Sequence, residues 1–404
     1  MQPAPFSDLK VLDLAWVVAG PVIGRVLADY GATVVRVESS RRVETARVMG
    51  PFPHGRPHPE QSGLYENCNA GKLGLALDLS RPEGRAVVRD LAAWADVLVE
   101  SFSPGQMARW GLDYLSLSTL RPGLIMLSTS LMGQTGPYAG FAGFGNVGAA
   151  MAGFQGLAGW PGELPVGPFG PYTDYLGPRC GLVALLAALD HRHRTGEGCW
   201  LDIAQAEAGL QFLAPEIAAY GATGEVAKAQ GNRDPQMAPH GVFRCAGEER
   251  WIALAARDDA EWRRLALMVC GEALADDPRF ATLAGRKGDE DTLEAIIAAW
   301  ASERSAGALE AALQAAGIPA HVVAASLDLW QDPQLQARGH FVALKHPLMG
   351  TSVVEASRYT LSATPARVAR SAPTFGRDRD QVLRGILGYD DARIAALDQV
   401  GVLA

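Results

Sequence analysis

Residues 9–38 read LKVLDLAWVVAGPVIGRVLADYGATVVRVE, and this stretch decides the fold. Residues 9–14 are predicted to form a short buried strand, because apolar residues dominate a run of strand length. The turn AGP comes next, and its proline suits the start of a helix, which apolar spacing extends over 22–30. A second strand follows at 33–38. A strand, a helix and a strand in this order predict a right-handed βαβ unit with parallel strands.

The same alternation continues along the first half of the chain. Strand-like stretches occur at 73–79, 96–100 and 124–129, and helical patterns occur at 82–94 and 177–194. Alternating strands and helices are typical of an α/β fold with a mostly parallel sheet. We therefore expect a layered α/β domain here.

The second half of the chain has a different pattern. A length of 404 residues exceeds that of one typical domain. Residues 220–236 are small and polar, as in a linker, and residues 237–317 combine a predicted hairpin with helices. This pattern predicts a smaller α+β domain. Residues 332–350 and 357–362 are interpreted as return segments before two terminal helices.

Charge and hydropathy exclude several classes of partner. Lys and Arg total 36 against 44 Asp and Glu, a net charge of -8, so no basic surface for nucleic acid is predicted. Residues 122–162 carry no charge, but they are rich in glycine rather than in Leu, Ile and Val. We expect buried loops there rather than a membrane helix. Neither nucleic acid nor a membrane is an expected partner.

The five cysteines indicate a reducing compartment. Their number is odd and no C-x-x-C pair occurs, which argues against a disulfide framework and against a structural zinc site. The first ten residues lack the charged and apolar regions of a signal peptide. We expect a cytoplasmic protein without a bound metal.

Glu38, at the end of the second predicted strand, raises a dinucleotide-binding alternative. An acid at this position holds a ribose hydroxyl when a glycine-rich turn binds the pyrophosphate. The turn here reads WVVAGPVIG and lacks the pattern G-x-G-x-x-G. Gly20 and Gly24 are then explained by close helix–sheet packing, and NAD binding is the weaker interpretation.

Residues 9–38 resemble the opening of the family III CoA-transferases, the group that contains formyl-CoA transferase and carnitine CoA-transferase. Further matches follow in order: NAGK at 69–72 with LDL at 77–79, ESFSPG at 100–105 with Arg109 and Gly111, GQTGPY at 133–138, AALDHRHRTGEG at 187–198, GIP at 317–319 and DPQL at 332–335. The ordered set spans almost the whole chain. It implies a Rossmann-like large domain at 1–220, a small α+β domain at 237–325 and a segment at 326–404 that returns to the large domain.

Asp174 lies in the segment GPYTDYLG at 170–177, where this family has its catalytic aspartate. The residues alone favour a helix N-cap at this position, whereas the resemblance implies a nucleophile. In that chemistry the carboxylate attacks an acyl-CoA thioester to give an anhydride and free CoA thiolate. The thiolate then forms an aspartyl-CoA thioester, and the acceptor acid reverses the sequence. The CoA thioester is a substrate, and neither a metal nor a permanently bound cofactor is implied.

The resemblance also implies a site for CoA. The matched positions are Val18, Ala19, Lys72, Leu77, Asp78, Leu79, Ser80, Ser101, Phe102, Ser103 and Arg109. Lys72 and Arg109 have the alternative of a structural or solvent-exposed role. Ser39 stands where formyl-CoA transferase has an arginine, for which Arg41 or Arg42 would compensate.

An apolar acyl pocket is expected from Trp16, Phe144 and Tyr172, which approach the acyl end by resemblance. No lysine occurs at 140–146, where formyl-CoA transferase has one. A second carboxylate buried among aromatic rings would suffer a desolvation penalty. We therefore expect monocarboxylic or bulky apolar acids to be preferred over oxalate, unless a second carboxylate reaches a cation such as Arg47 or Arg233.

Two other functions remain open at this point. An acyl-CoA racemase of the same superfamily needs acid–base groups on both faces of the α-carbon. In GFGN at 143–146 its histidine is replaced by Phe144, which cannot transfer a proton. A non-catalytic CoA-binding subunit of a heteromeric transferase is the other alternative, and Asp174 argues against it.

The resemblance implies an assembly as well as a reaction. Two chains of this family are threaded through each other as an interlocked dimer. The expected partner is therefore a second copy of this chain or a related sister chain, besides the acyl-CoA and carboxylic acid substrates.

Overall fold

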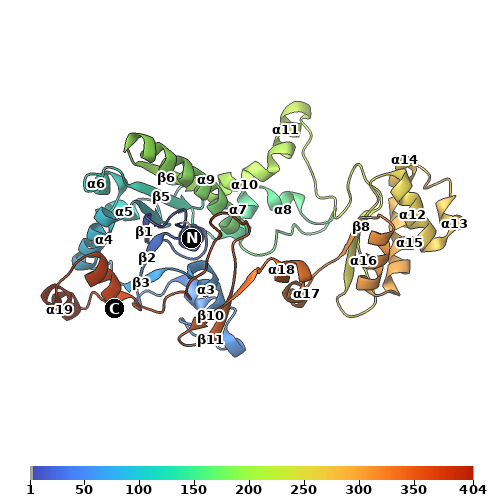
Figure 1. Cartoon of the computed structure of the whole chain (residues 1–404). Coiled ribbons are helices and arrows are strands. Elements are labelled where there is room, and N and C mark those ends of the chain that lie inside the picture. The colour runs from blue at the N-terminus through green and yellow to red at the C-terminus, as the bar shows by residue number, and fades with distance from the viewer. Residues whose placement is uncertain (1–2, 404) are drawn as a thin grey trace. The chain divides into compact units, whose positions relative to one another are not determined.

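The computed structural model describes residues 3–403 and contains a parallel six-stranded sheet (Figure 1). Its strands are β1 Lys10–Asp13, β2 Thr33–Glu38, β3 Leu73–Ala76, β4 Val97–Glu100, β5 Ile125–Ser130 and β6 Cys199–Ala204. Their spatial order is β3-β2-β1-β4-β5-β6, and every neighbouring pair is parallel. This is the strand order of doubly wound, Rossmann-type sheets. The predicted α/β class is confirmed.

Helices cover both faces of this sheet. Helix α1, Ala19–Asp29, and helix α9, Tyr172–Thr195, pack together on one face, and helix α4, Pro82–Trp94, packs on the other. Successive strand residues point to opposite faces, so Val11 joins the core beneath α1 and α9 while Leu12 joins the core beneath α4. Helix α9 begins five residues earlier than the 177–194 prediction, and α1 begins three residues before the predicted 22–30.

The C-terminal part of the chain returns to this core. Strands β10, Phe341–His346, and β11, Gly350–Glu355, form an antiparallel hairpin. The short helix η3, Gln381–Ile386, and helix α19, Asp391–Gln399, follow it. Val382 and Ile394 are buried with Val87 of α4 in the same cluster, and Figure 1 shows α19 close to α4. The first strands and the last helices of the chain are therefore stabilised by one core.

Shorter helices lie between these elements along the chain. They are α2 Thr45–Val48, η1 Pro53–Gly55, α3 Gly63–Asn69, α5 Gln106–Arg109, α6 Tyr114–Ser118, α7 Gly145–Met151, α8 Phe154–Leu157, α10 Gln205–Leu210, η2 Gln211–Leu213, α11 Ala214–Thr223 and α18 Pro333–Ala337.

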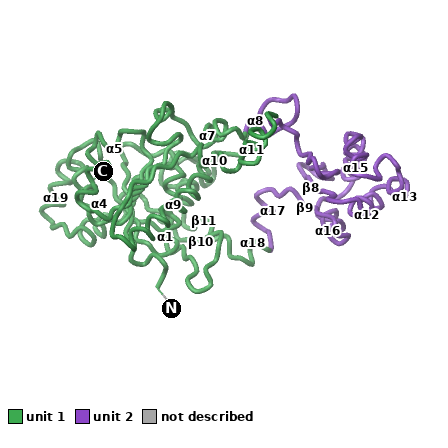
Figure 2. The backbone as a smooth tube through the Cα atoms, turned by 90° about the horizontal axis from the view of Figure 1, so that it is seen from above, with its two compact units in different colours: residues 1–154, 167–225, 334–404 green, residues 155–166, 226–333 purple. Residues whose placement is uncertain are grey.

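The chain divides into two compact units (Figure 2). Unit 1 contains residues 1–154, 167–225 and 334–404, and unit 2 contains residues 155–166 and 226–333. Unit 2 has an antiparallel sheet of β7 His240–Arg244, β8 Trp251–Ala255 and β9 Ala320–Val322. Its helices are α12 Asp259–Cys270, α13 Glu272–Ala275, α14 Leu283–Gly288, α15 Glu290–Ser302, α16 Ala306–Ala315 and α17 Ser326–Gln331.

Unit 2 has its own hydrophobic core. Trp262, Phe280 and Ile297 are buried together with the strand residue Ile252. Sequence patterns had anticipated a small α+β domain, but they gave no indication that residues 155–166 would group with it.

The uncharged stretch 122–162 differs from its expected burial. Strand β5 is buried, but Phe141 and Phe144 are each 50% exposed and Trp160 is 56% exposed. The absence of charge therefore does not reflect a buried interior throughout. None of the helices in residues 3–403 has the length and apolar character needed to cross a bilayer.

The order of the strands places a crevice between β1 and β4. In a doubly wound sheet the connections leave these two neighbouring strands in opposite directions, so the loops at their carboxyl ends separate and leave room for a ligand. The backbone N–H of Trp16, after β1, donates to the Ser101 hydroxyl, after β4, at 2.7 Å. This bond ties the two loops together at the edge where a site is expected.

Candidate active site

A cavity of about 600 Å³ lies at the carboxyl ends of the central strands. Its walls come from the loop after β1, the loop after β4, the end of β5 and the segment before α7. They include residues 16–19, 101–104, 129–131 and 139–144, together with Arg42, Thr45, Asp174 and Gln205. Segments far apart in the sequence therefore meet at one site.

Asp174 is the buried carboxylate of this cavity. It belongs to the first turn of α9, and 5% of the residue is exposed. The Gly145 backbone N–H donates to its Oδ2 at 3.2 Å, and the Gln205 side chain hydrogen-bonds to it. Burial raises the pKa of Asp174 to about 6, and these two hydrogen bonds limit the rise. The carboxylate is thus ionised at neutral pH but more basic than an exposed aspartate.

The N-cap alternative for Asp174 does not hold. Pro171 occupies the N-cap position of α9, and no side chain there makes a capping hydrogen bond. The Asp174 side chain instead contacts Gly145, which precedes it by 29 residues. Its contacts are those of a group held in a cavity rather than those of a helix cap.

Close packing around Asp174 requires glycine at position 145. A Cβ there would lie 2.6 Å from the Asp174 nitrogen and 2.8 Å from its Cγ, too close for any side chain. Thr173, the neighbour of Asp174, donates from Oγ1 to the Gly145 carbonyl at 3.0 Å. The start of α7 is therefore fixed against the start of α9, which sets the position of the Gly145 N–H.

Gln205 was not identified from the sequence. It begins α10 directly after β6 and is 7% exposed. Its Oε1 lies 3.5 Å from the Thr173 hydroxyl, which leaves the amide N–H groups for the Asp174 carboxylate. Gln205 belongs to none of the motifs matched in the sequence, and the segment GFGN at 143–146 gave no indication that the Gly145 N–H contacts Asp174, so the fold reveals both contacts.

A second cavity of about 490 Å³ adjoins the first. It contains the predicted residues Leu77–Ser80 and is also lined by Gln106 and Trp110. Trp16, Arg42 and Phe102 line both cavities, so the two cavities share a wall. The Arg42 guanidinium lies over the Trp16 ring at 5.2 Å from its centroid. The site is therefore elongated, with Asp174 in one part and an arginine where the two parts meet.

The loop at Asp78 is held by local hydrogen bonds. The Ser80 hydroxyl and its backbone N–H donate to Oδ1 of Asp78 at 2.6 and 2.9 Å, and these bonds lower the pKa of Asp78. Arg41 approaches the same carboxylate at 3.4 Å. Asp78 thus contributes a negative charge to the wall of the second cavity, and this charge is paired with the exposed Arg41.

Most predicted site residues lie at these cavities, with three departures. Val18, Ala19, Ser101, Phe102 and Ser103 line the first cavity, as do Trp16 and Phe144. Tyr172 packs edge-on against Phe154 and does not line it. Arg109 is exposed and donates to Gln106, its neighbour on α5, so it stands beside the second cavity without lining it.

Lys72 is the third departure and corrects the expectation of a CoA contact. Its ammonium is fully buried and donates to Asp13 at 2.6 Å, to the Pro21 carbonyl at 2.7 Å and to Asn69 at 2.7 Å. Burial lowers the pKa of Lys72 to about 8, against the opposing effect of Asp13. An ammonium has three protons, and all three are used inside the protein. Lys72 therefore has no donor left for a phosphate.

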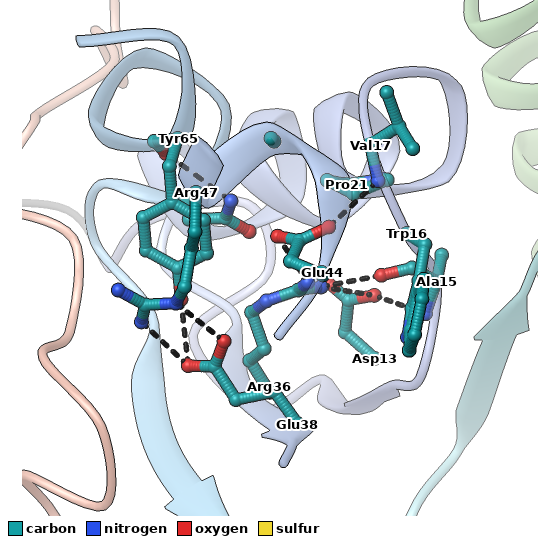
Figure 3. A network of polar contacts seen from close by, with 12 residues as sticks. Asp13, Ala15, Trp16, Val17, Pro21, Arg36, Glu38, Glu44, Arg47 and Tyr65 are labelled. Carbon is teal, nitrogen blue, oxygen red and sulfur yellow. Dashed lines mark hydrogen bonds and ion pairs between the residues drawn. The ribbon is translucent and has the colours of Figure 1, made fainter. Parts of the chain in front are cut away.

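A buried network of charges lies behind the loop after β1 (Figure 3). Arg47 binds both carboxylate oxygens of Glu38 at 2.7 Å, and Tyr65 donates to Glu38 at 2.9 Å. Arg36 pairs with Glu44 at 2.7 Å. Glu38 is therefore not free to hold a ribose, which removes the dinucleotide alternative.

The two arginines proposed from sequence for a second carboxylate are occupied as well. Arg47 is 1% exposed and satisfied by Glu38 and two backbone carbonyls. Arg233 belongs to unit 2 and pairs with Glu294 at 2.7 Å. Arg42 is the arginine that lines the cavity of Asp174. Within residues 3–403, no cluster of three or more His, Cys, Asp or Glu side chains is arranged to hold a metal.

Comparison with known proteins agrees with this geometry. The family model described as CoA-transferase family III matches residues 6–379. A succinyl-CoA–D-citramalate CoA-transferase of Chloroflexus aurantiacus is 33% identical over 99% of this chain and 98% of its own. A succinate–glutarate CoA-transferase of Agrobacterium fabrum is 34% identical over 94% of this chain and 95% of its own. Both alignments are almost full-length.

A solved structure shares the fold. The crystal structure of a CAIB/BAIF family protein from Brucella suis superposes with a TM-score of 0.88. It is 30% identical and covers 95% of this chain and 100% of its own.

Proposed function

The chain belongs to CoA-transferase family III, and from this premise we propose how it moves CoA between two carboxylic acids. As a CoA-transferase it acts on an acyl-CoA and a free carboxylate. We assign the covalent relay to Asp174. The observation that carries this assignment is a single buried carboxylate in the first cavity, fixed by the Gly145 N–H and by Gln205.

The proposed reaction begins with ionised Asp174. Its carboxylate attacks the thioester carbonyl of acyl-CoA, forming a mixed anhydride as the carbon–sulfur bond breaks and CoA leaves as a thiolate. The thiolate attacks Cγ of Asp174, which gives aspartyl-CoA and releases the donor acid. The acceptor carboxylate then attacks Cγ, forms a new anhydride and displaces the thiolate, which returns to the acceptor's acyl carbon. Asp174 is regenerated, so covalent relay divides one exchange into easier steps.

Two groups are placed to stabilise the oxyanions formed at Cγ of Asp174. The Gly145 N–H and the Gln205 amide already contact this carboxylate before the reaction. When Cγ becomes tetrahedral, negative charge concentrates on a carboxylate oxygen such as Oδ2, which the Gly145 N–H contacts. Donors that are oriented in advance stabilise such charge without reorganisation.

The CoA moiety is proposed to occupy the second cavity and the passage to the first. Support comes from Leu77–Ser80 and Phe102, which line that cavity and match the family positions around CoA. A nucleotide held there would keep the thiolate close to the anhydride during the relay. Arg109, at the margin, would reach a phosphate only by leaving Gln106.

The acids are proposed to be dicarboxylates of four or five carbons. The two relatives described above are named for citramalate and glutarate, with succinyl-CoA or succinate as the other substrate. Arg42 offers the charge for a second carboxylate, whereas Leu131, Phe141 and Phe144 contribute apolar surface to the wall. Oxalate would hold its second carboxylate next to the reacting one, in surroundings that penalise an unpaired charge.

The alternative activities receive less support. Phe144 lines the cavity at the position of the racemase histidine and has no proton to transfer. A non-catalytic subunit would not require a buried carboxylate with a raised pKa, such as that of Asp174, in a cavity of this size. We therefore retain the transferase.

We also propose that the working enzyme contains two interlocked chains, in the cytoplasm. Exposed apolar side chains of unit 1 support a contact with another chain, among them Phe169, Phe212 and Ile217. The five cysteines are free thiols, which supports a reducing compartment. Light scattering of the purified protein tests the assembly: twice the chain mass is expected for the homodimer, and a single-chain mass in the active enzyme would contradict it.

The test of function is Asp174→Asn, with Asp190→Asn as the matched control. Asp190 lies on the same helix, exposed and paired with Arg194. Transfer of CoA from succinyl-CoA to glutarate should be abolished in the first variant and retained in the second. Hydroxylamine added with succinyl-CoA should inactivate the wild type and modify the peptide that contains Asp174. Full activity of Asp174→Asn, with the substitution verified by peptide mass, refutes the proposal.

A further inference from the structure

Val17 has a backbone conformation that its side chain disfavours. Its φ is 66°, in the left-handed region, where a β-branched residue is a genuine outlier. Val17 also lines the cavity of Asp174, between Trp16 and Val18. Conformations of this kind persist only when the surrounding structure enforces them. Something must therefore hold the backbone of Val17 in place.

The structure shows which groups hold it. The Val17 N–H donates to Oε2 of Glu44 at 2.8 Å. The other oxygen of Glu44 accepts from Arg36 at 2.7 Å, and Arg36 also donates to the Ala15 carbonyl at 2.5 Å. The buried Arg36–Glu44 pair thus hydrogen-bonds to the backbone of Ala15 and of Val17, on the two sides of Trp16, as Figure 3 shows.

The neighbouring backbone donors are held in the same manner. The Ala15 N–H donates to Asp13 at 3.0 Å, and the Trp16 N–H donates to Ser101 at 2.7 Å. Asp13 ends strand β1, and Ser101 follows strand β4. Ala15 and Trp16, which donate to them, both have ordinary negative φ angles. Within residues 3–403, Glu44 is the acceptor that the N–H of Val17 uses, so the loss of this carboxylate would release the residue with the unfavourable angle.

We propose that Glu44 is a positioning residue for CoA transfer: its carboxylate keeps Val17 in the left-handed conformation with which this residue forms part of the wall of the Asp174 cavity. Glu44 touches no substrate and acts through the loop. This inference rests on the proposed function of Asp174. Catalysis by held reactants is sensitive to small displacements, so a relaxed loop would misplace the thioester relative to the carboxylate.

The Glu44→Gln variant tests this through its dependence on residue 17. The amide keeps the size of the side chain but loses the charge that pairs with Arg36. In the wild-type background we expect kcat to fall by about tenfold or more, with a smaller change in KM for acyl-CoA. In a Val17→Gly background the same substitution should lower kcat by about twofold, because glycine adopts a positive φ without enforcement.

Val17→Gly alone removes part of the cavity wall, so only the comparison between backgrounds is interpreted. Equal loss of kcat in both backgrounds, or no loss in the wild-type background, overturns the proposal. If Glu44→Gln does not fold, Glu44→Asp serves instead. The aspartate retains a charge for Arg36 but withdraws the carboxylate from the Val17 N–H, and the same dependence on residue 17 is expected.

A matched control separates positioning from general stability. Glu261 in unit 2 also accepts a backbone N–H, that of Arg257 at 2.9 Å, and pairs with the same arginine side chain. Glu261→Gln should lower the thermal midpoint while kcat stays at the wild-type value. Glu44→Gln enzyme should still be modified at Asp174 by hydroxylamine, only more slowly. Absence of that modification in the wild type would refute the role of Asp174 rather than that of Glu44.

Discussion

The backbone N–H of Gly145 donates to the carboxylate of Asp174 at 3.2 Å, although 29 residues separate them in the sequence. This contact joins the start of α7 to the first turn of α9. It orients one oxygen of a carboxylate whose burial makes it a stronger base and nucleophile than an exposed aspartate. The contact would persist when that oxygen becomes the carbonyl oxygen of an anhydride or a thioester.

The pH dependence of transfer should report Asp174. Burial raises its pKa to about 6, so the nucleophile is protonated below that pH and ionised above it. We expect kcat/KM for acyl-CoA to fall about tenfold per pH unit below pH 6, where an unperturbed aspartate would stay active. Initial rates from pH 4.5 to 8 with one acyl-CoA, at about unit steps or finer, provide the profile.

The titration of Glu100 has to be separated from that of Asp174 in this experiment. Glu100 lies at the end of β4, accepts from the Phe102 N–H at 2.7 Å, and burial raises its pKa to about 7. Glu100→Gln removes this neighbouring titration and should leave the inflection at about pH 6. An inflection that disappears with Glu100 would assign the profile to that residue.

Gly145→Ala should disable transfer. The new Cβ would stand 2.6 Å from the Asp174 nitrogen, so α7 must move away and withdraw its N–H. Loss of one oriented donor to an oxyanion lowers kcat by about 100-fold or more. Gly221→Ala, in α11, is the control because a Cβ there meets open space. Wild-type kcat in Gly145→Ala would exclude this N–H from the mechanism.

Arg42→Ala should weaken recognition of a dicarboxylate. A charge-assisted hydrogen bond contributes about 1.5–3 kcal/mol, which corresponds to a rise in KM for glutarate of about 10- to 100-fold. The KM for butyrate, which lacks a second carboxylate, should stay the same. Arg41→Ala is the matched control, since Arg41 lines only the second cavity and contacts Asp78. Equal effects on both acids, together with a higher KM for acyl-CoA, would instead assign Arg42 to a CoA phosphate.

Lys72→Met should destabilise the fold without a specific effect on CoA. The substitution removes one of the two cations of buried Asp13 and leaves it only Arg36, at 3.5 Å; breaking a buried pair in this way costs about 3–5 kcal/mol. Denaturant unfolding should show that loss, while the KM for acyl-CoA of the folded enzyme stays at the wild-type value. A higher KM with unchanged stability would restore Lys72 to the CoA site.

Much of the sheet could be predicted because parallel strands are buried on both faces. Such strands appear as short runs rich in β-branched and other apolar residues, and residues 33–38 and 124–129 are examples whose observed bounds differ by at most one residue. Helix starts were harder to place. The predicted helix over 177–194 begins at Tyr172 in the structure, and α9 contains Pro178 in its interior.

The site was predicted only where it depends on ordered motifs. Resemblance pointed to Asp174, and the structure places that residue in a cavity with the predicted loops. Lys72 was misjudged because its burial depends on Asp13, 59 residues away. The contacts of Gln205 and of the Gly145 N–H with Asp174 could not be predicted, since they arise when α7, α9 and α10 pack together.

The covalent role of Asp174 is tested most directly by transfer of oxygen. If the acceptor's carboxylate carries heavy oxygen, it attacks aspartyl-CoA, and one labelled oxygen remains on Asp174 when the thiolate takes the acyl group. After turnover with labelled glutarate and succinyl-CoA, mass spectrometry should find heavy oxygen in the peptide that contains Asp174. The label should be absent when succinyl-CoA is omitted. An Asp174 peptide that stays unlabelled while labelled glutarate is converted to its CoA thioester would contradict the account.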